Sequence, residues 1–304
     1  MKLLTIKGNN IPDDLKTLPD VTDLNNLIQR GFIVVDKPAG MTSHDVVDSI
    51  REIYGIRKVG HAGTLDPMVT GVLPIGIGEG TKLLRFLLES GKVYLCEMLV
   101  HKDIEAELIE KALHDQIGVI TQLPPVKSRV KRVNREREIY SLDIKSITKR
   151  KAIFEVYCEA GTYIRKLCHD VGEHLGTGAN MHKLQRLSAG GFKIDEAVTL
   201  DELKKVKSVD AKSVLKYLLP LEAMVSHKPK IWISDGAAKT VSQGAKLAAP
   251  GIIAFEEFFE KDFVFLFRYD GKLVAVAQAE ISSDEAQEIN RGIVAIPHKI
   301  IKNS

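Results

Sequence analysis

One loop in the first third of the sequence concentrates residues that restrict the backbone around a single carboxylate. The stretch from Gly60 to Pro74 holds three glycines and two prolines in 15 residues, which fixes an irregular shape. Asp66 is its one carboxylate, and Pro67 restricts Asp66 to extended conformations. A single carboxylate held in this way suits covalent attack on a glycosidic carbon. The same pattern fits a structural turn in which Asp66 binds the backbone, and the residues alone leave both interpretations open.

A second chemical feature is a basic segment further along the chain. Between Lys127 and Lys151 there are ten Lys or Arg residues against three Asp or Glu residues. Residues 1–30 balance at four against four, and residues 228–304 at ten against ten. A focused positive charge of this kind favours contact with a polyanion such as nucleic acid. A solvated basic hairpin without a partner is the alternative.

The composition narrows the class of protein. The chain has 304 residues, of which 44% are hydrophobic and 27% charged, enough for two or three domains with their own cores. No run approaches 18 uncharged apolar residues, and the first ten residues lack a secretory pattern, so we expect no membrane association. Cys96, Cys158 and Cys168 are widely spaced. We therefore expect buried thiols, no metal site, and a cytosolic or nuclear protein, with the cytoplasm preferred.

The elements that must position these residues mix helices and strands without a regular alternation. Hydrophobic periodicity predicts helices over 42–54, 80–88, 104–116 and 162–175, and strands over 32–35, 93–100, 139–147 and 152–158. The helix at Thr42 begins with a capping box completed by Asp45. This order favours an α+β fold with a mixed or antiparallel sheet.

The pattern of residues changes in the last part of the chain. Short β-rich runs at 231–233, 263–269 and 273–279 are separated by glycine turns, and Asp270-Gly271 is a strong hairpin signal. We predict a small β-barrel over 228–304, a catalytic domain over 31–227, and an extension over 1–30 that packs on the barrel.

Several motifs together resemble the TruB/dyskerin family of pseudouridine synthases. The loop Gly60–Pro67 resembles the family's signature motif, and Pro250-Gly251-Ile252 resembles its RNA-binding PUA module. Other matching motifs occur in family order: Asp36-Lys37-Pro38, Thr42-Ser43-His44, Gly91-Lys92-Val93-Tyr94, Pro124-Pro125-Val126-Lys127-Ser128, Val130-Lys131-Arg132, Ala160-Gly161-Thr162-Tyr163-Ile164-Arg165, Leu184-Gln185-Arg186 and Gly191-Phe192. The resemblance covers roughly residues 25–300. The Ser43-His44 pair and the PUA module are similar to the archaeal and eukaryotic branch, which works in box H/ACA ribonucleoproteins.

The resemblance implies an isomerisation of uridine to pseudouridine that needs no redox cofactor, nucleotide or metal. Asp66 would be the nucleophile, Arg165 would pair with it, and Tyr94 would stack on the flipped base. The remaining residues implied to contact or organise the RNA site are His61 (base extrusion or loop packing), Lys37 (loop order), Lys82 and Arg186 (phosphate), Leu184 (base packing), Lys131 and Arg132 (basic segment), and Gly244 and Lys246 (PUA module).

The implied partners are tRNA, rRNA, box H/ACA guide RNA and small accessory proteins of that ribonucleoprotein. Two positions depart from the family pattern: Gln185 stands where a basic residue is expected, and Asn180 where a histidine is more usual. Both departures put an RNA contact in doubt. The segment after Val100 also leaves little room for the long RNA-gripping insertion of the bacterial stand-alone enzymes.

Three functions compete. The enzyme could act under guide RNA or alone on the T-loop uridine of tRNA. A non-catalytic RNA-binding scaffold is the alternative, but Asp66, Arg165 and Tyr94 are all present. A glycoside hydrolase would need two carboxylates flanking one bond, and no matching motif gives Asp66 an acidic partner.

Overall fold

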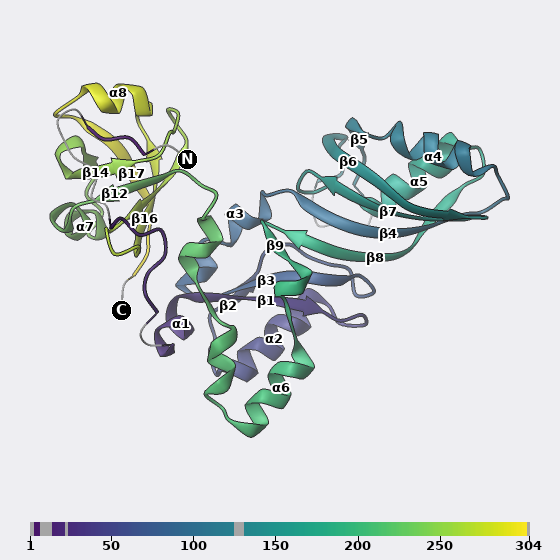
Figure 1. The fold of residues 1–304 in the computed structure, drawn as a ribbon, viewed down its shortest axis with the longest axis horizontal. Coiled ribbons are helices and arrows are strands. Elements are labelled where there is room, and N and C mark those ends of the chain that lie inside the picture. The colour runs from purple at the N-terminus through teal and green to yellow at the C-terminus, as the bar shows by residue number, and fades with distance from the viewer. Residues whose placement is uncertain (1–2, 7–13, 22–23, 125–130, 303–304) are drawn as a thin grey trace. The chain divides into compact units, whose positions relative to one another are not determined.

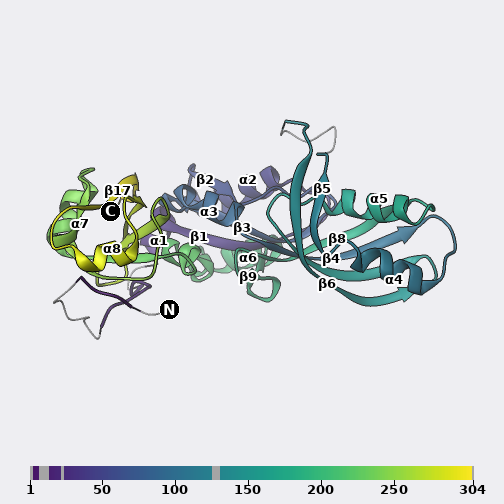
Figure 2. The ribbon, with the colours of Figure 1, turned by 90° about the horizontal axis from the view of Figure 1, so that it is seen from above.

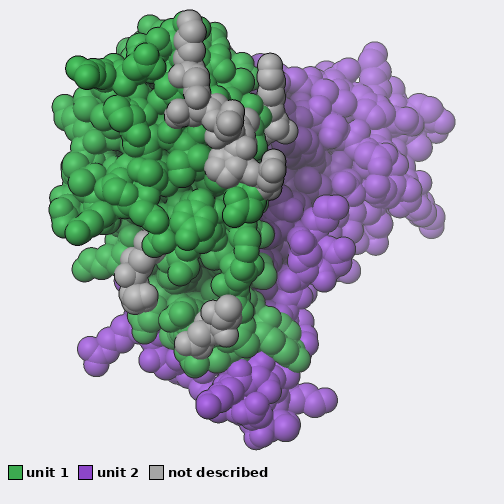
Figure 3. All heavy atoms as spheres, turned by 60° about the vertical axis from the view of Figure 1, so that its left-hand side comes forward, with its two compact units in different colours: residues 1–32, 76–83, 215–304 green, residues 33–75, 84–214 purple. Residues whose placement is uncertain are grey.

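A computed structural model describes residues 3–6, 14–21, 24–124 and 131–302. Its contacts group the chain into two compact units, one of residues 1–32, 76–83 and 215–304 and the other of residues 33–75 and 84–214 (Figure 3). Neither unit is one continuous stretch of the chain, because the N-terminal residues and the short segment at 76–83 group with the C-terminal part. The predicted domain boundaries at 30 and 227 therefore stay a prediction.

The larger sheet is mixed. Its main strands follow the order β10-β1-β3-β8-β4-β7-β6-β5, with β11 beside β1, β2 beside β3, and β9 beside β8. These strands are β1 (Gly31–Lys37), β2 (Val59–His61), β3 (Thr70–Gly78), β4 (Lys92–Val100), β5 (Gly118–Gln122), β6 (Arg135–Thr148), β7 (Lys151–Cys158), β8 (Ala179–Ala189), β9 (Phe192–Lys193), β10 (Val198–Thr199) and β11 (Leu219–Pro220). β4 pairs antiparallel with β7 and β8, whereas β3 pairs parallel with β8. The predicted α+β class with a mixed sheet is confirmed.

The helices are interspersed irregularly with the strands along the chain. They are α1 (Asn25–Arg30), α2 (Ser43–Tyr54), α3 (Leu84–Leu88), α4 (Ala106–His114), α5 (Ile164–His174), α6 (Leu200–Val209), α7 (Asp235–Ser242) and α8 (Ser283–Glu288), with short 3-10 helices η1 (Glu79–Lys82), η2 (Ile194–Glu196), η3 (Ser213–Tyr217), η4 (Leu221–Val225) and η5 (Ala249–Gly251). Among the described residues, no helix combines the length and the apolar character needed to cross a membrane.

The core of the second unit lies between α4, α5 and one face of the sheet. Along β4 every second residue is buried, because alternate side chains of a strand point to opposite faces. The buried face of β4 packs with β6, β7 and the apolar stripe of α5 in one hydrophobic cluster. Figures 1 and 2 both place α4 and α5 on the same face of these strands. This packing orients the first turn of α5.

The start of α2 agrees with the sequence-based prediction, whereas one other predicted helix is not continuous. The capping box is present, since Thr42 Oγ1 accepts from the Asp45 amide and the Asp45 carboxylate accepts from the Thr42 amide. The helix predicted over 80–88 is instead divided into η1 and α3. Gly80 packs so closely that a Cβ there would lie 2.1 Å from the carbonyl oxygen of Gly31. This close backbone contact leaves no room for a side chain at residue 80.

The first unit is built on a six-stranded barrel-like sheet. Its order is β13-β17-β16-β15-β12-β14. The strands are β12 (Lys230–Ile233), β13 (Leu247–Ala248), β14 (Ile252–Phe255), β15 (Phe263–Phe267), β16 (Leu273–Ala279) and β17 (Ile293–Ile300). The predicted β-barrel in this region is confirmed, and Gly271 has the positive φ of 83° that the hairpin between β15 and β16 requires.

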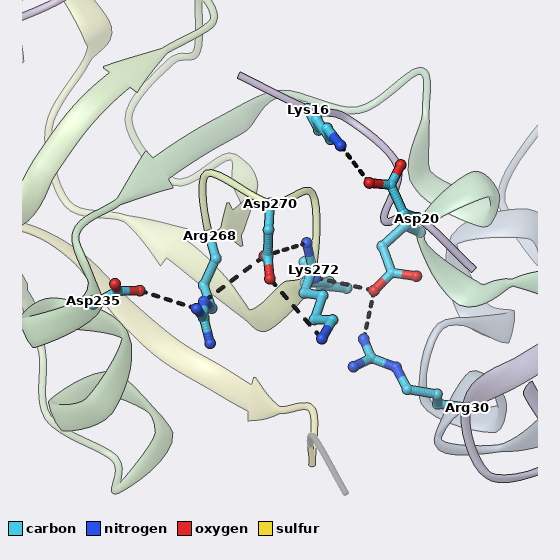
Figure 4. Close-up of polar contacts among 9 residues, drawn as sticks. Lys16, Asp20, Arg30, Asp235, Arg268, Asp270 and Lys272 are labelled. Atoms are coloured by element: carbon cyan, nitrogen blue, oxygen red, sulfur yellow. Dashed lines mark hydrogen bonds and ion pairs between the residues drawn. The ribbon is translucent and has the colours of Figure 1, made fainter. Parts of the chain in front are cut away.

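Residues of the N-terminal extension contact this barrel. Leu4 forms an antiparallel bridge with Phe255, and the Trp232 indole donates to the carbonyl oxygen of Lys16 at 2.8 Å. At the end of the extension, Arg30 pairs with the buried Glu222, whose Oε1 also accepts from the Leu273 amide at 3.0 Å. Figure 4 shows Arg30 together with Asp270 and Lys272 of the turn between β15 and β16. The described residues of the extension thus bond to the barrel at Leu4 and Lys16, and to Glu222 at Arg30.

Candidate active site

Asp66 and Arg165 form an ion pair at the surface of the second unit. Arg165 Nη2 donates to Asp66 Oδ2, and the side chains are 57% and 53% exposed. Arg165 lies in the first turn of α5, and Asp66 lies in the loop between β2 and β3. The structure therefore places the predicted nucleophile and its predicted cation together, with both side chains open to solvent. The open position leaves room for a substrate to reach the carboxylate.

Lys37 holds the backbone that follows Asp66. Its ammonium is fully buried and donates to the carbonyl oxygens of Pro38 at 2.8 Å, Met41 at 2.6 Å and Pro67 at 3.0 Å. The Gly40 amide donates to the same Pro67 carbonyl at 2.9 Å. Burial lowers the pKa of Lys37, with smaller opposing effects from nearby carboxylates. These contacts are what the predicted ordering of the loop requires.

Ser43 holds the residue that precedes Asp66. Its hydroxyl accepts from the Leu65 amide at 2.9 Å and donates to the Leu65 carbonyl at 3.3 Å. Both neighbours of Asp66 are therefore tied to the segment that leads into α2. The sequence alone suggested no role for Ser43, although its place in the Thr42-Ser43-His44 motif marked it.

Arg186 supports the same loop from inside the protein. Its side chain is buried, at 1% exposure, and donates to the carbonyl oxygens of Val72 at 2.7 Å and Gly63 at 3.2 Å. A phosphate contact would have to displace these bonds and expose the guanidinium, so for Arg186 it stays a prediction. Its guanidinium satisfies backbone carbonyls that burial would otherwise leave without donors.

Tyr94 and Leu184 lie behind the ion pair. Tyr94 is 9% exposed and belongs to the hydrophobic cluster that contains Leu65 and Ile164, the chain neighbours of Asp66 and Arg165. Burial raises the pKa of Tyr94, and the positive charge of nearby Arg186 opposes this shift. Leu184 is half-buried against the same cluster. Stacking of Tyr94 on a base, and packing of Leu184 against it, stay predictions.

His61 is half-buried at the start of the loop. Its ring meets the edge of His44 with 5.5 Å between centroids, and its Nδ1 is buried without a hydrogen-bond partner among the described residues. Burial, followed by the charges of His44 and Arg186, lowers the pKa of His61. The ring is therefore neutral at neutral pH and suited to packing or hydrogen bonding beside a base.

The other predicted RNA contacts fall into two groups. Lys131 and Arg132 are exposed, while residues 125–130, which carry part of the basic segment and of the Pro124–Ser128 motif, lie outside the described residues. Lys82, in the first unit, pairs with Glu79 and donates to the Ile300 carbonyl at 2.7 Å. A phosphate would have to compete with these two acceptors for the Lys82 ammonium, and this contact stays a prediction.

The two residues predicted in the PUA module follow α7. Gly244 has a positive φ of 95°, and open space surrounds its Cα. Lys246 is exposed two residues later. Both are accessible on the first unit, and their contact with RNA stays a prediction.

Family models match three parts of the chain. Residues 51–107 match the TruB family pseudouridylate synthase N-terminal domain, residues 165–226 match the tRNA pseudouridylate synthase B C-terminal domain, and residues 229–301 match the PUA domain. The loop that bears Asp66 lies in the first match, and Arg165 begins the second.

Curated relatives and solved structures align over most of the chain. A probable tRNA pseudouridine synthase B of Pyrobaculum aerophilum is 41% identical over 93% of this chain and 87% of its own length. A protein of the same name from Methanosarcina barkeri is 41% identical over 93% and 86%. A chain in the crystal structure of a Cbf5-Nop10-Gar1 complex has a TM-score of 0.90 at 36% identity, covering 99% of this chain and 94% of that one. A chain of an H/ACA RNP bound to a substrate RNA containing 2′-deoxyuridine has a TM-score of 0.89 at 34% identity, covering 99% and 95%.

Proposed function

Because the chain belongs to the TruB family of RNA pseudouridine synthases, we propose that Asp66 is the nucleophile with which it isomerises uridine to pseudouridine. Asp66 attacks the flipped nucleotide at the sugar C1′ or the base C6. The base detaches from the sugar, rotates and rejoins through C5, and the bond between Asp66 and the nucleotide breaks. The C5 proton is released and N1, freed from the sugar, takes up a proton. Reactant and product are isomers, so the reaction has no net oxidation or group transfer.

The observation that carries this proposal is the pairing of Asp66 with Arg165 on a loop fixed from both sides. The guanidinium binds Oδ2 of Asp66 and fixes the carboxylate in place, and an ionised carboxylate is the form able to attack. Ser43 and Lys37 fix the residues before and after Asp66, which lowers the entropy that must be lost when substrate and nucleophile are aligned.

The RNA substrates are assigned from the relatives' names and from the family resemblance. We assign tRNA because curated relatives over 40% identical are called tRNA pseudouridine synthases, and the resemblance implies its T-loop uridine as the target. We assign rRNA and box H/ACA guide RNA, together with small accessory proteins like those of the Cbf5-Nop10-Gar1 complex, from the similarity to chains solved in such assemblies. The barrel then holds the guide RNA, through contacts near Gly244 and Lys246.

The cysteines support a cytoplasmic site of action. Cys96, Cys158 and Cys168 are buried free thiols, a state that a reducing compartment maintains. Processing of tRNA and rRNA in the cytoplasm is consistent with this chemistry.

The test is turnover of the purified chain on a tRNA transcript, measured with and without guide RNA and accessory proteins. Pseudouridine formation in either arm that disappears in Asp66→Asn supports the proposal. Activity in the guided arm alone assigns the guided mode, and activity without guide RNA assigns stand-alone action. Tight RNA binding without product in both arms would make the chain a non-catalytic scaffold.

A further inference from the structure

The buried side-chain amide of Gln122 binds both backbone groups of Tyr163. Gln122 ends β5 and is 1% exposed. Its Oε1 accepts from the Tyr163 amide at 2.9 Å, and its Nε2 donates to the Tyr163 carbonyl at 3.2 Å. A primary amide carries one acceptor and one donor group, so these two bonds satisfy both sides of the side chain and fix its orientation.

Tyr163 is the residue from which α5 begins. It occupies the N-cap position without a side-chain cap of its own, although Ser, Thr, Asp or Asn commonly supply that bond. Its carbonyl also accepts the first helical hydrogen bond, from Leu167 at 3.0 Å. Gln122 therefore fixes the start of the helix from a neighbouring strand, two residues before Arg165.

The loop that leads from β7 to α5 is also bonded where it begins. The Glu159 amide donates to the Glu138 carbonyl at 2.8 Å, and the Glu138 amide donates to the Glu159 carboxylate at 3.2 Å. Between these residues and Tyr163 the chain turns through Gly161, which has a positive φ of 85°. The loop is thus bonded to β6 at its beginning and to β5, through Gln122, at its end.

The pair of Asp66 and Arg165 depends on this support. Both side chains are more than half exposed, and exposed ion pairs contribute little energy by themselves because water competes and the side chains lose entropy. An exposed pair cannot set its own geometry. The backbone that carries Arg165 must do so.

We propose that Gln122 is a positioning residue for the reaction: by binding Tyr163 it sets the first turn of α5 and holds Arg165 against Asp66. The inference rests on the proposed function. A purely structural role would instead lower stability and leave the turnover of folded protein unchanged, and the two roles are separable by kinetics.

Gln122→Glu tests the inference with almost no change of volume. The ionised glutamate still accepts from the Tyr163 amide, but its second oxygen faces the Tyr163 carbonyl and repels it. The protonated glutamate regains a donor. Burial raises the pKa of a carboxyl group above the ordinary value of about 4.3, so protonation falls within a usable range. The variant should lose about 100-fold in kcat at about pH 8, with KM for RNA near that of the wild type.

The pH profile is the decisive readout. Relative to the wild type at each pH, the loss in Gln122→Glu should shrink as the pH falls toward about 5.5, because protonation restores the second hydrogen bond. Gln116→Glu introduces the same charge in the same unit and should keep wild-type kcat at both pH values. Wild-type kcat in folded Gln122→Glu at about pH 8, or a loss that does not change with pH, would overturn the inference.

Two measurements keep the test open if Gln122→Glu does not fold. If Gln122 acts through Arg165, adding Gln122→Met to the Arg165→Met variant should lower kcat little further. If the two substitutions lower kcat by independent, additive amounts of activation free energy, the inference is contradicted. In the wild type, hydrogen exchange at the Tyr163 amide should be slow, and exchange as fast as in an open peptide also contradicts it. Absence of pseudouridine from the wild type in every arm refutes the proposed function, while Tyr163 exchange still tests the geometry.

Discussion

Asp66 and Arg165 are 99 residues apart in the chain and meet as an ion pair between a loop and the first turn of a helix. Each residue has its own backbone support. Ser43 and Lys37 bind the chain neighbours of Asp66, and Gln122 binds Tyr163 ahead of Arg165. The buried polar groups thus fix two exposed side chains that could not fix each other.

Asp66→Asn should abolish pseudouridine formation while leaving the fold and RNA binding nearly unchanged. Asparagine keeps the volume and one carbonyl oxygen but removes the negative charge that makes the group a nucleophile. Asp48→Asn is the matched control, because Asp48 is an exposed aspartate of the same unit paired with Arg51. The measurement is product per RNA over time. Product at more than a trace of the wild-type rate in Asp66→Asn contradicts the assignment.

Arg165→Met should lower kcat by about 100-fold or more, and Arg165→Lys should lower it less. Methionine removes the cation, and mutation of a single preorganised charge-stabilising donor commonly costs this much. Lysine keeps the charge but not the planar guanidinium. Lys166→Met is the control, since Lys166 is the next residue and pairs with Asp170 in its own helix. Equal kcat values for Arg165→Met and Lys166→Met would show that the pair has no part in turnover.

Replacing Lys131 and Arg132 together by alanine should weaken RNA binding alike across sequences. Both residues are exposed. Each lost phosphate contact should make the slope of log affinity against log salt shallower by about one unit. The double replacement of Lys204 and Lys205, exposed lysines of α6, removes the same charge elsewhere in the unit. If the salt slope is unchanged, or changes equally in both variants, these two residues face solvent.

The sequence could predict which residue types gather at the site, but not which of them are buried. Asp66 and Arg165 stand in motifs whose resemblance to a family suggested their meeting. Arg186 stands in a motif of the same kind, yet its guanidinium lies under the loop. The sequence shows that a residue is an arginine, but not whether its guanidinium contacts phosphate or backbone carbonyls. Gln122 gave no signal, because its partner is the backbone of a residue 41 positions away.

The fold likewise has features that local sequence patterns predict and features that they do not. The mixed sheet and the hairpin at Gly271 follow from periodicity and turn chemistry, which are local properties. The segment over 80–88 is divided into η1 and α3. It also contains Gly80, which packs against the backbone of Gly31, 2.1 Å from where a Cβ would be. A contact between distant backbones leaves no periodic pattern in either segment, so the continuous helix over 80–88 could not be excluded from the sequence.

Arg186→Met should destabilise the protein and leave the salt dependence of RNA binding unchanged. The substitution removes this donor from the carbonyls of buried Val72 and half-buried Gly63, and we expect a loss of about 2 to 4 kcal/mol in the free energy of unfolding. Urea denaturation measures this loss, and Arg51→Met, on the exposed face of α2, is the control. A shallower salt slope with unchanged stability would support the phosphate contact instead.

Lys92→Met should change how stability depends on pH. Lys92 is buried and donates to the carbonyl oxygens of Leu87, Leu88 and Ser90. Burial lowers the pKa of Lys92 to about 8, against an ordinary value of about 10.4 in the unfolded chain. Between these two values the unfolded chain binds a proton that the folded protein does not. The free energy of unfolding contributed by Lys92 therefore rises with pH across this window.

Methionine keeps the apolar length of Lys92 and does not titrate, so the difference between the two proteins isolates this residue from other lysines. The free energy of unfolding of the wild type minus that of Lys92→Met should be constant below about pH 8. It should then increase by a few kcal/mol, about 1.4 for each unit of pKa displacement, as the pH approaches about 10.4. The measurement is urea denaturation of both proteins across the window. A difference that stays flat, or falls as the pH rises, would mean that the ammonium remains charged in the folded protein and that its three carbonyl acceptors outweigh the cost of burial.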